Sequence, residues 1–335
     1  QRRVHGKWKL SKVICKFHSR AMRVPLKLRP LDTRTSLQIF LRYFSSNYSN
    51  QVPPIRVAET ELLGRSVFAT RSITYGELIH TAKPLVAHPA VSLNNRVCYL
   101  CLKRLNPSQS TTEKFGSFCS KPCADEARGF FELESSCDWS AFDEHCRSLG
   151  LKYPLMAKRL ACMVAAKATS AESISVLQPA VLPRELVVEM EKGFELLRNS
   201  LTRTQIAQHR LSFLTKQWYI DAIARFRINA FRVELTTASY EDLLSSAAAF
   251  VDGESAVGNA VYILPSMYNH DCDPNAHIVW TENAYAKLMA LRDVDEGEEL
   301  RICYIDGSIS REARQHILRN GFGFMCSCPR CTSED

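Results

Sequence analysis

The sequence NHDCDPN stands at residues 269–275, followed by GEELRICY at 297–304 and CSCPRC at 326–331. The last segment contains three closely spaced cysteines, Cys326, Cys328 and Cys331. A structural zinc ion takes four ligands, so this segment is one ligand short. Cys272, in the loop-like first segment, is the best candidate for the fourth. We expect a zinc ion to join the two segments as a long-range crosslink that contributes folding energy.

A second cysteine pattern lies upstream and consists of two pairs, Cys98 with Cys101 and Cys119 with Cys123. Two closely spaced pairs complete a tetrahedral all-sulfur zinc site without another ligand. A redox dithiol is the competing interpretation, but the βαβ pattern that accompanies it is missing here. The two clusters together predict two zinc ions per chain. The remaining cysteines are interpreted as buried or incidental thiols: Cys15, Cys137, Cys146, Cys162 and Cys303.

Composition indicates an ordinary globular protein. The chain has 335 residues, 46% hydrophobic and 23% charged, which excludes collagen-like, low-complexity and wholly disordered proteins. No apolar run approaches the roughly 18 residues of a membrane-spanning helix, so we expect no membrane insertion. The 13 cysteines are too few for a disulfide-stapled secreted protein, in which about 8–10% of residues are cysteine.

The positive charge is concentrated near the N-terminus. Residues 1–50 contain 12 Lys and Arg against one acidic residue, so the other 285 residues carry a formal charge of −3 out of a total of +8. Three interpretations of the basic leader, residues 1–52, stay open: a mitochondrial transit peptide with a processing junction at Arg42–Ser45, a disordered basic tail, or a nuclear-import tract. The mildly acidic body argues against direct nucleic-acid binding.

The order of the predicted elements points to an α+β fold. Short β-branched and aromatic runs around Gly64 predict a hairpin in residues 55–70, and Leu78–Ala82, before Pro84, suggests a second strand pair. Apolar residues then recur at helical spacing between residues 150 and 228, where we interpret them as core faces. Strand-like runs return at Ala260–Leu264, His277–Trp280 and Leu300–Tyr304. This order does not fit a sheet built from repeating βα units.

The three segments quoted first, in that order, resemble the SET-domain protein lysine methyltransferases. Residues 64–70 resemble the first SET motif. The cysteine pairs at 98–123, between two SET halves, resemble the split SET-and-MYND type, and the layout is most similar to the plant Trithorax-related SET proteins. The resemblance covers about residues 55–331. It implies a SET-domain β-fold with a pseudoknot, in which the tail threads beneath a loop.

The same resemblance supplies the expected domain boundaries. They are the basic leader (1–52), the SET N-terminal part (53–97), the MYND-like zinc insert (98–123), a helical insert (124–228), the SET C-terminal part (229–306) and a zinc-binding post-SET tail (307–335). The chain departs from the family pattern in two places. Ser66 stands where the first motif usually has a second glycine, and the MYND-like insert has cysteines for one zinc ion where that module normally binds two.

The resemblance implies methyl transfer from S-adenosyl-L-methionine to the side-chain amine of a protein lysine. Histone tails are the default substrate of the family, and the nucleus is its default location. Such a site works by positioning and by burial, which lowers the lysine pKa from its usual value near ~10.4. Tyr304 matches the catalytic tyrosine, and Phe324 matches the residue that stacks on adenine. The other positions that match cofactor contacts are Arg65, Ser66, Asn229, Ser266, Asn269 and His270.

Two alternatives to a histone methyltransferase stay open. The first is a SET-fold zinc protein of weak activity that acts as an interaction module, because a fold does not by itself carry a chemistry. The second is a methyltransferase of a non-histone organellar protein, which the transit-peptide interpretation of the leader would favour.

Overall fold

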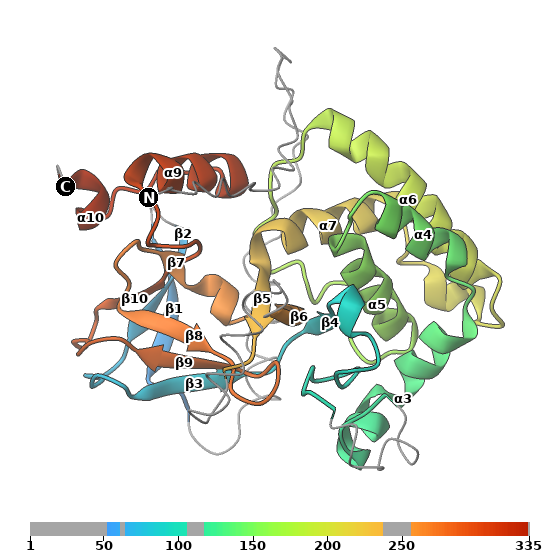
Figure 1. Ribbon diagram of the computed structural model, residues 1–335, viewed down its shortest axis with the longest axis horizontal. Helices are drawn as coiled ribbons and strands as arrows, with labels where there is room; N and C mark the ends of the chain where they lie inside the picture. Colours follow the sequence, from blue (N-terminus) through green and yellow to red (C-terminus); the bar gives the residue numbers. More distant parts are fainter. Residues whose placement is uncertain (1–51, 61–63, 106–116, 237–255, 334–335) are drawn as a thin grey trace, which may run out of the picture.

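The computed structural model describes residues 52–60, 64–105, 117–236 and 256–333. Almost all of the predicted leader, and Cys15 within it, lies outside these ranges. Figure 1 shows strands gathered on one side of the molecule and the helices between residues 121 and 229 on the other. Strands therefore precede and follow a helical segment, as the sequence predicts.

The first sheet has the strand order β1-β2-β10-β7. Its strands are β1 (Ile55–Thr60), β2 (Gly64–Ala69), β10 (Glu299–Ile302) and β7 (Asn269–His270). The predicted hairpin is confirmed, because β1 and β2 pair antiparallel from Ile55 opposite Ala69 to Thr60 opposite Gly64. β10 is antiparallel to β2 on one side and parallel to β7 on the other. This sheet therefore joins the beginning of the described chain to its C-terminal part.

Two three-stranded sheets complete the β structure. One contains β3 (Leu78–Ala82), β9 (Ala286–Ala290) and β8 (Ala276–Val279), and the other contains β4 (Val86–Pro89), β6 (Ala256–Val261) and β5 (Ala230–Glu234). β3 pairs with the distant β9, so Leu78–Ala82 forms no local hairpin. The strand predicted at 260–264 is β6, which begins and ends earlier because the chain turns after Val261 toward the 3-10 helix Pro265–Met267. The strand predicted at 300–304 is β10, which begins at Glu299 and ends at Ile302.

The close approach of β4 to β6 depends on Gly258. A Cβ atom at this position would lie 2.3 Å from the carbonyl oxygen of His88 and 2.9 Å from Cδ1 of Leu102. Real Cβ contacts do not come this close, so the absence of a side chain at Gly258 allows the two strands to pair.

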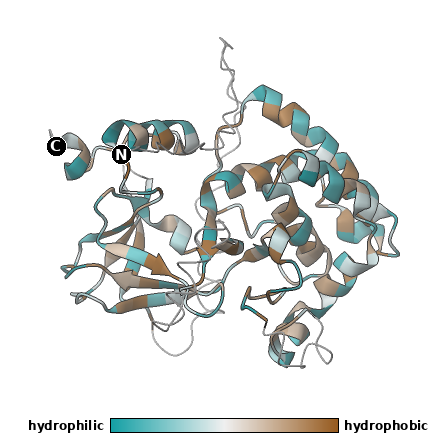
Figure 2. Ribbon diagram, in the orientation of Figure 1, coloured by the Kyte–Doolittle hydropathy of each residue, from teal (hydrophilic) through white to brown (hydrophobic). Residues whose placement is uncertain are grey.

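Five longer helices form the helical side of the molecule. They are α3 (Lys121–Ser136), α4 (Ser140–Ser148), α5 (Tyr153–Ala165), α6 (Arg184–Thr202) and α7 (Lys216–Asn229). The predicted core stripes lie on α5 and α7, where four members are buried and three are partly buried against the same core. The buried members are Met156, Leu160, Ala222 and Phe226, and the partly buried ones are Met163, Val164 and Trp218. Figure 2 shows α6 alternating between hydrophilic and hydrophobic colours, as expected for an amphipathic helix on the surface of this group.

The remaining helical elements are short. They comprise the 3-10 turns Val91–Leu93 and Gln208–Leu211, α9 (Arg311–Ile317), the π-helical turn Leu318–Phe322 and α10 (Pro329–Thr332). The described part of the chain has no helix whose length and apolar character suit it to crossing a bilayer.

A buried ion pair attaches the region of the first cysteine cluster to the helices. Arg159 of α5 donates from Nε to Oε2 of Glu134 on α3 at 3.3 Å, and from Nη1 to the carbonyl oxygens of Ala87 and Tyr99 at 3.0 and 2.7 Å. Burial acts to raise the pKa of Glu134, but the positive charges of Arg159 and Lys158 and a hydrogen bond from Tyr99 together outweigh it, so the pKa is lowered. One guanidinium thereby holds α3, β4 and the cysteine loop together, and its burial is tolerable because its charge is paired with that of Glu134.

Candidate active site

The C-terminal cysteine cluster consists of the four predicted ligands, Cys272, Cys326, Cys328 and Cys331, whose sulfur atoms lie within 4.8 Å of one another. The Sγ atom of Cys272 is 3.9 Å from that of Cys326 and 3.5 Å from that of Cys331. A tetrahedron with Zn–S distances of about 2.3 Å has sulfur–sulfur edges of about 3.8 Å. The cluster therefore fits zinc, and Cys272 is the fourth member as predicted.

The upstream cluster has the same composition. The sulfur atoms of Cys98, Cys101, Cys119 and Cys123 also lie within 4.8 Å of one another, with 3.5 Å between Cys101 and Cys119 and 3.7 Å between Cys119 and Cys123. A hydrogen bond with Cys101 lowers the pKa of Cys98 to about 5, which favours a thiolate. These two clusters are the groups in the described ranges that could hold a metal ion, and four cysteine ligands in each suit a structural zinc ion.

The thiols outside the clusters are placed as expected. Cys146 and Cys162 are buried, Cys137 and Cys303 are partly buried, and all four are free. Burial raises the pKa of Cys146 to about 12 and that of Cys137 to about 11, so both stay protonated at neutral pH.

A cavity of about 990 Å³ lies where α7, β2, β7 and the C-terminal segment meet. This volume is at the upper end of the roughly 300–1,000 Å³ typical of ligand pockets. Six of the eight predicted catalytic and cofactor residues line it: Arg65, Asn229, Ser266, Asn269, Tyr304 and Phe324. Ser66 and His270 are buried and lie outside its lining.

Tyr304 has a fixed hydroxyl group. Its Oη donates to the carbonyl oxygen of Tyr268 at 2.6 Å, and burial raises its pKa, so the phenol is neutral at physiological pH. The single hydroxyl hydrogen is used in this contact, which leaves the oxygen lone pairs as acceptors. Phe322 and Phe324 pack around the ring, with centroid distances of 5.1 and 6.4 Å.

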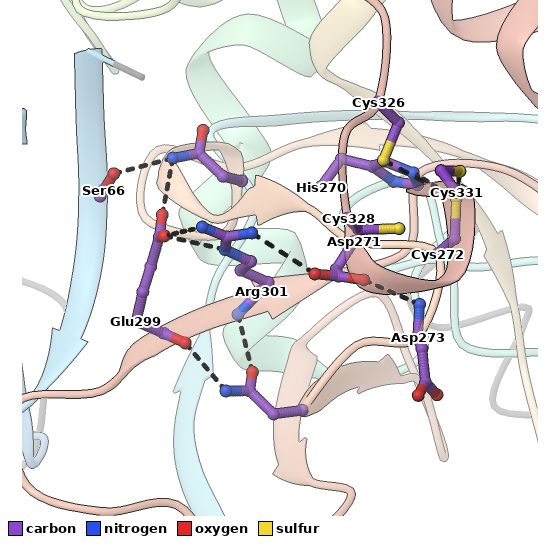
Figure 3. Close-up of polar contacts among 12 residues, drawn as sticks. Ser66, His270, Asp271, Cys272, Asp273, Glu299, Arg301, Cys326, Cys328 and Cys331 are labelled. Atoms are coloured by element: carbon purple, nitrogen blue, oxygen red, sulfur yellow. Dashed lines mark hydrogen bonds and ion pairs between the residues drawn. The ribbon is translucent and has the colours of Figure 1, made fainter. Parts of the chain in front are cut away.

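The side-chain amide of Asn269 is held by three hydrogen-bond acceptors. Its amide Nδ2 lies 2.8 Å from Oγ of Ser66, 2.8 Å from Oε1 of Glu299 and 3.2 Å from the carbonyl oxygen of Arg65. Ser66, predicted as a cofactor contact, thus turns its hydroxyl toward Asn269 from within the core. In Figure 3, Arg301 lies between Glu299 and Asp271, to which it donates at 2.5 and 3.4 Å.

His270 lies beside the C-terminal cluster (Figure 3) and also contacts the backbone of Tyr304. Its Nε2 is 3.3 Å from Sγ of Cys272, and its Nδ1 accepts from the backbone N–H of Tyr304 at 3.1 Å. Burial lowers the pKa of His270 to about 4. The side chain thus contacts neighbouring protein groups through both nitrogens.

Asn229 and Arg65 connect the cavity to the segment that precedes α6. Asn229 Nδ2 donates to the carbonyl oxygens of Gln178 and Arg225, both at 2.8 Å. Both amide hydrogens are thus used, and the amide oxygen remains available as an acceptor. Arg65 donates to the carbonyl oxygen of Val176, and burial lowers its pKa. Sequence reasoning could not find Val176 and Gln178, because backbone carbonyls leave no signal in side-chain identity.

Ser266 carries an unpaired hydroxyl group in the lining of the cavity. Its hydroxyl oxygen is buried in the cavity wall and has no hydrogen-bond partner among the described residues. Buried hydroxyl groups are normally paired, so the Ser266 hydroxyl group is an exception in the cavity wall. Together with the ring of Phe324 and the amide oxygen of Asn229, it fits a nucleoside with polar substituents, as S-adenosyl-L-methionine has.

Comparison with known proteins agrees with this architecture. The family model described as the SET domain matches residues 64–305. The chain is 53% identical over 310 residues to the histone-lysine N-methyltransferase ATXR4 of Arabidopsis thaliana, covering 91% of this chain and 95% of that protein. It is 22% identical over 273 residues to a SET and MYND domain-containing protein of Dictyostelium discoideum, covering 77% of each.

A solved structure of the SET domain of LSMT, bound to lysine and AdoHcy, aligns with a TM-score of 0.40 at 14% identity and covers 88% of this chain and 58% of that one. The family assignment depends on the sequence comparisons and not on this structural alignment. Because the SET model spans most of the described chain and the Arabidopsis relative is similar over nearly its full length, the chain belongs to the SET-domain family.

Proposed function

We propose that this protein is an S-adenosyl-L-methionine-dependent protein lysine N-methyltransferase and that its substrate is a histone lysine. The observation that carries the proposal is the cavity of about 990 Å³, which gathers Tyr304, Asn229, Asn269, Ser266 and Phe324 from distant parts of the chain. The 53% identical Arabidopsis relative is named as a histone-lysine N-methyltransferase, which supports the choice of substrate.

The chain contributes position and a low-polarity environment to the reaction. Bound S-adenosyl-L-methionine supplies a methyl group on a sulfonium, and the attacking group is a neutral lysine amine. Phe322 and Tyr304 form an aromatic wall on which the lysine loses solvation, and burial of this kind lowers a lysine pKa. The wall thereby raises the fraction of lysine that can attack.

Tyr304 orients the amine. Its hydroxyl hydrogen is committed to the carbonyl oxygen of Tyr268, so its oxygen accepts an N–H hydrogen of the incoming lysine. This contact directs the nitrogen lone pair and places a fixed dipole beside the transferring methyl group, where preorganised dipoles are most effective.

The cofactor is held by the other residues of the cavity. We assign Phe324 to stacking on the adenine, and Asn229, Ser266 and Asn269 to polar contacts with the rest of the molecule. Arg65 shapes the wall through its bond to the Val176 carbonyl group. Ser66 acts one step further away, by holding the amide of Asn269.

Two further parts of the proposal concern the setting of the enzyme. A histone substrate places the protein in the nucleus, whereas a functional transit peptide in residues 1–52 would place it in mitochondria. The body of the chain carries a formal charge of −3, so we propose that it recognises a protein segment and does not bind nucleic acid directly.

The test uses the full chain, labelled S-adenosyl-L-methionine, and separate incubations with core histones and a mitochondrial extract. Tyr304→Phe removes the hydroxyl group, and Tyr75→Phe is the matched control because Tyr75 is 74% exposed and lies outside the cavity. Labelled histones with wild type and Tyr75→Phe, but not with Tyr304→Phe, support the proposal. Labelling of the extract alone would move the substrate to the organelle, and no labelling by folded, zinc-loaded protein would favour an interaction module.

A further inference from the structure

The backbone of Tyr304 lies past the end of the hydrogen-bonded pairing between β10 and β7. β10 ends at Ile302, whose register partner in β7 is His270. The carbonyl oxygen of Ile302 accepts from the backbone N–H of Asp271 at 3.0 Å. Two residues further on, the N–H of Tyr304 donates to Nδ1 of His270 at 3.1 Å. The imidazole nitrogen of His270 thus accepts the backbone hydrogen bond that a carbonyl oxygen of the neighbouring strand would accept within a sheet.

The hydrogen-bond partners determine which nitrogen of His270 carries the proton. A backbone N–H can only donate, so Nδ1 is the acceptor and must be unprotonated. The hydrogen of the neutral ring is then on Nε2, which lies 3.3 Å from Sγ of Cys272. Nε2 therefore donates to the sulfur, and each contact reinforces the tautomer that the other requires.

The ring is also confined by its neighbours. The centroid of the His270 ring is 5.2 Å from that of Tyr304 and 6.0 Å from that of Phe324. The residue itself is 7% exposed. A displacement of the Cys272 sulfur would therefore move the imidazole and, through Nδ1, the backbone of Tyr304.

We propose that His270 is a positioning residue that joins a ligand of the C-terminal zinc site to the backbone of the catalytic tyrosine. The inference rests on the proposed function only in calling Tyr304 catalytic. The contact of His270 with Cys272 is tested without any measurement of activity. Under this proposal the zinc site has a second role besides attaching the C-terminal tail. Through His270, its ligand Cys272 also determines the position of the Tyr304 backbone.

Three substitutions separate the two contacts. His270→Phe keeps a ring of similar shape and removes both hydrogen bonds. His270→Asn keeps an acceptor near the position of Nδ1 but is too short to reach the sulfur. His277→Phe is the control, since His277 is an exposed histidine of β8 in the same half of the chain.

The first measurement is cadmium-113 NMR of the full chain loaded with cadmium at both cysteine clusters. The C-terminal resonance is identified by its loss in Cys328→Ser. We expect His270→Phe and His270→Asn to shift this resonance, because a donor to Cys272 is removed, while the resonance of the upstream cluster stays in place. A C-terminal resonance that does not move in either variant overturns the proposal, even if the enzyme is active.

The second measurement is kinetic and uses the zinc-loaded enzyme. We expect His270→Phe to lower kcat at least about tenfold, since a displacement of 1 Å at a reacting centre can cost about 10²-fold. His270→Asn, which retains the acceptor, should recover part of this loss, and His277→Phe should match wild type. Equal kcat in His270→Phe and wild type would contradict the proposal. If wild type has no activity, the proposed function fails while the cadmium spectra still decide whether His270 contacts Cys272.

Discussion

The amide nitrogen of Asn269 lies 2.8 Å from one carboxylate oxygen of Glu299, while the other oxygen of the same carboxylate accepts two hydrogen bonds from Arg301, at 2.8 and 2.5 Å. Glu299 therefore uses both oxygens, one toward the cavity and one toward a guanidinium. The position of Asn269 depends on a charge that does not itself line the cavity.

This relationship predicts the effect of Glu299→Gln. Glutamine keeps the length of the side chain but replaces one acceptor with a donor, so Asn269 and Arg301 cannot both be satisfied. Hydrogen bonds to charged groups contribute about 1.5–3 kcal/mol, and we expect the free energy of unfolding to fall by about this amount and cofactor affinity to fall with it. Urea unfolding and calorimetric titration with S-adenosylhomocysteine measure the two effects. Glu296→Gln, at an exposed position of the turn that precedes β10, should change neither.

Removal of one ligand tests the C-terminal zinc site. A serine hydroxyl is a poor zinc ligand at neutral pH, so Cys328→Ser should reduce the zinc content from two ions per chain to one. Because the site crosslinks Cys272 to the tail, the melting temperature should fall as well. Cys303→Ser is the control, since the Cys303 thiol donates to the carbonyl oxygen of Ile305 at 3.1 Å and belongs to neither cluster. Two zinc ions in Cys328→Ser would show that this residue is not a ligand.

A buried histidine predicts how stability changes with pH. Burial lowers the pKa of His80 to about 3, and its Nε2 lies 2.8 Å from the hydroxyl oxygen of Tyr268. The unfolded chain takes up a proton near pH 6.5 and the folded chain does not, so stability is lost as the pH falls below this value. Between pH 7.5 and 5.5, one such histidine lowers the free energy of unfolding by about 1.4 kcal/mol.

His80→Gln should remove this contribution, because glutamine does not titrate. Urea unfolding at the two pH values measures it. The exposed His209 provides the control variant His209→Gln, which should keep the wild-type pH dependence. Equal pH dependence in His80→Gln and wild type would mean that the imidazole of His80 is accessible to protons in the folded state.

Substitution by alanine should change the free energy of unfolding in opposite directions at two glycines, Gly258 and Gly129. At Gly258 the new Cβ would meet a backbone oxygen at 2.3 Å, so Gly258→Ala should lower the free energy of unfolding by about 1–3 kcal/mol through overpacking. At Gly129, within α3, the nearest atom would be Cβ of Ala166 at 3.8 Å, an ordinary contact. Gly129→Ala should therefore stabilise the protein by up to about 1 kcal/mol, through helix propensity. Thermal unfolding of both variants measures the two signs, and a stable Gly258→Ala would mean that β4 can move away from β6.

The parts of the fold that could be predicted from the sequence depend on short-range or chemically restrictive patterns. The hairpin around Gly64 is local, and both cysteine clusters follow from the few ways in which four thiolates can bind one ion. Pairing of β3 with β9 could not be predicted, because the partner lies about 200 residues away and many strands share its apolar pattern. The end of β6 was misplaced because the apolar run continues past Val261 into a turn.

The same distinction applies to the site. Tyr304, Asn269 and Phe324 could be assigned from motifs, and the structure brings them to one cavity. The sequence does not show that Ser66 and His270 turn their side chains to neighbouring protein groups, because side-chain direction depends on contacts made after folding. The sequence does not show the role of Glu299 for the same reason, since this role appears only when β7 lies beside β10.

The cavity takes one wall from Arg65 and another from Phe324, and the sheet beneath it pairs β2 with β10. During translation, a growing chain therefore exposes β1 and β2 long before their partner strand exists. Protein synthesis must reach Cys331 before the last thiolate can join Cys272. We expect products of premature termination to be inactive as a class, with no graded activity among them.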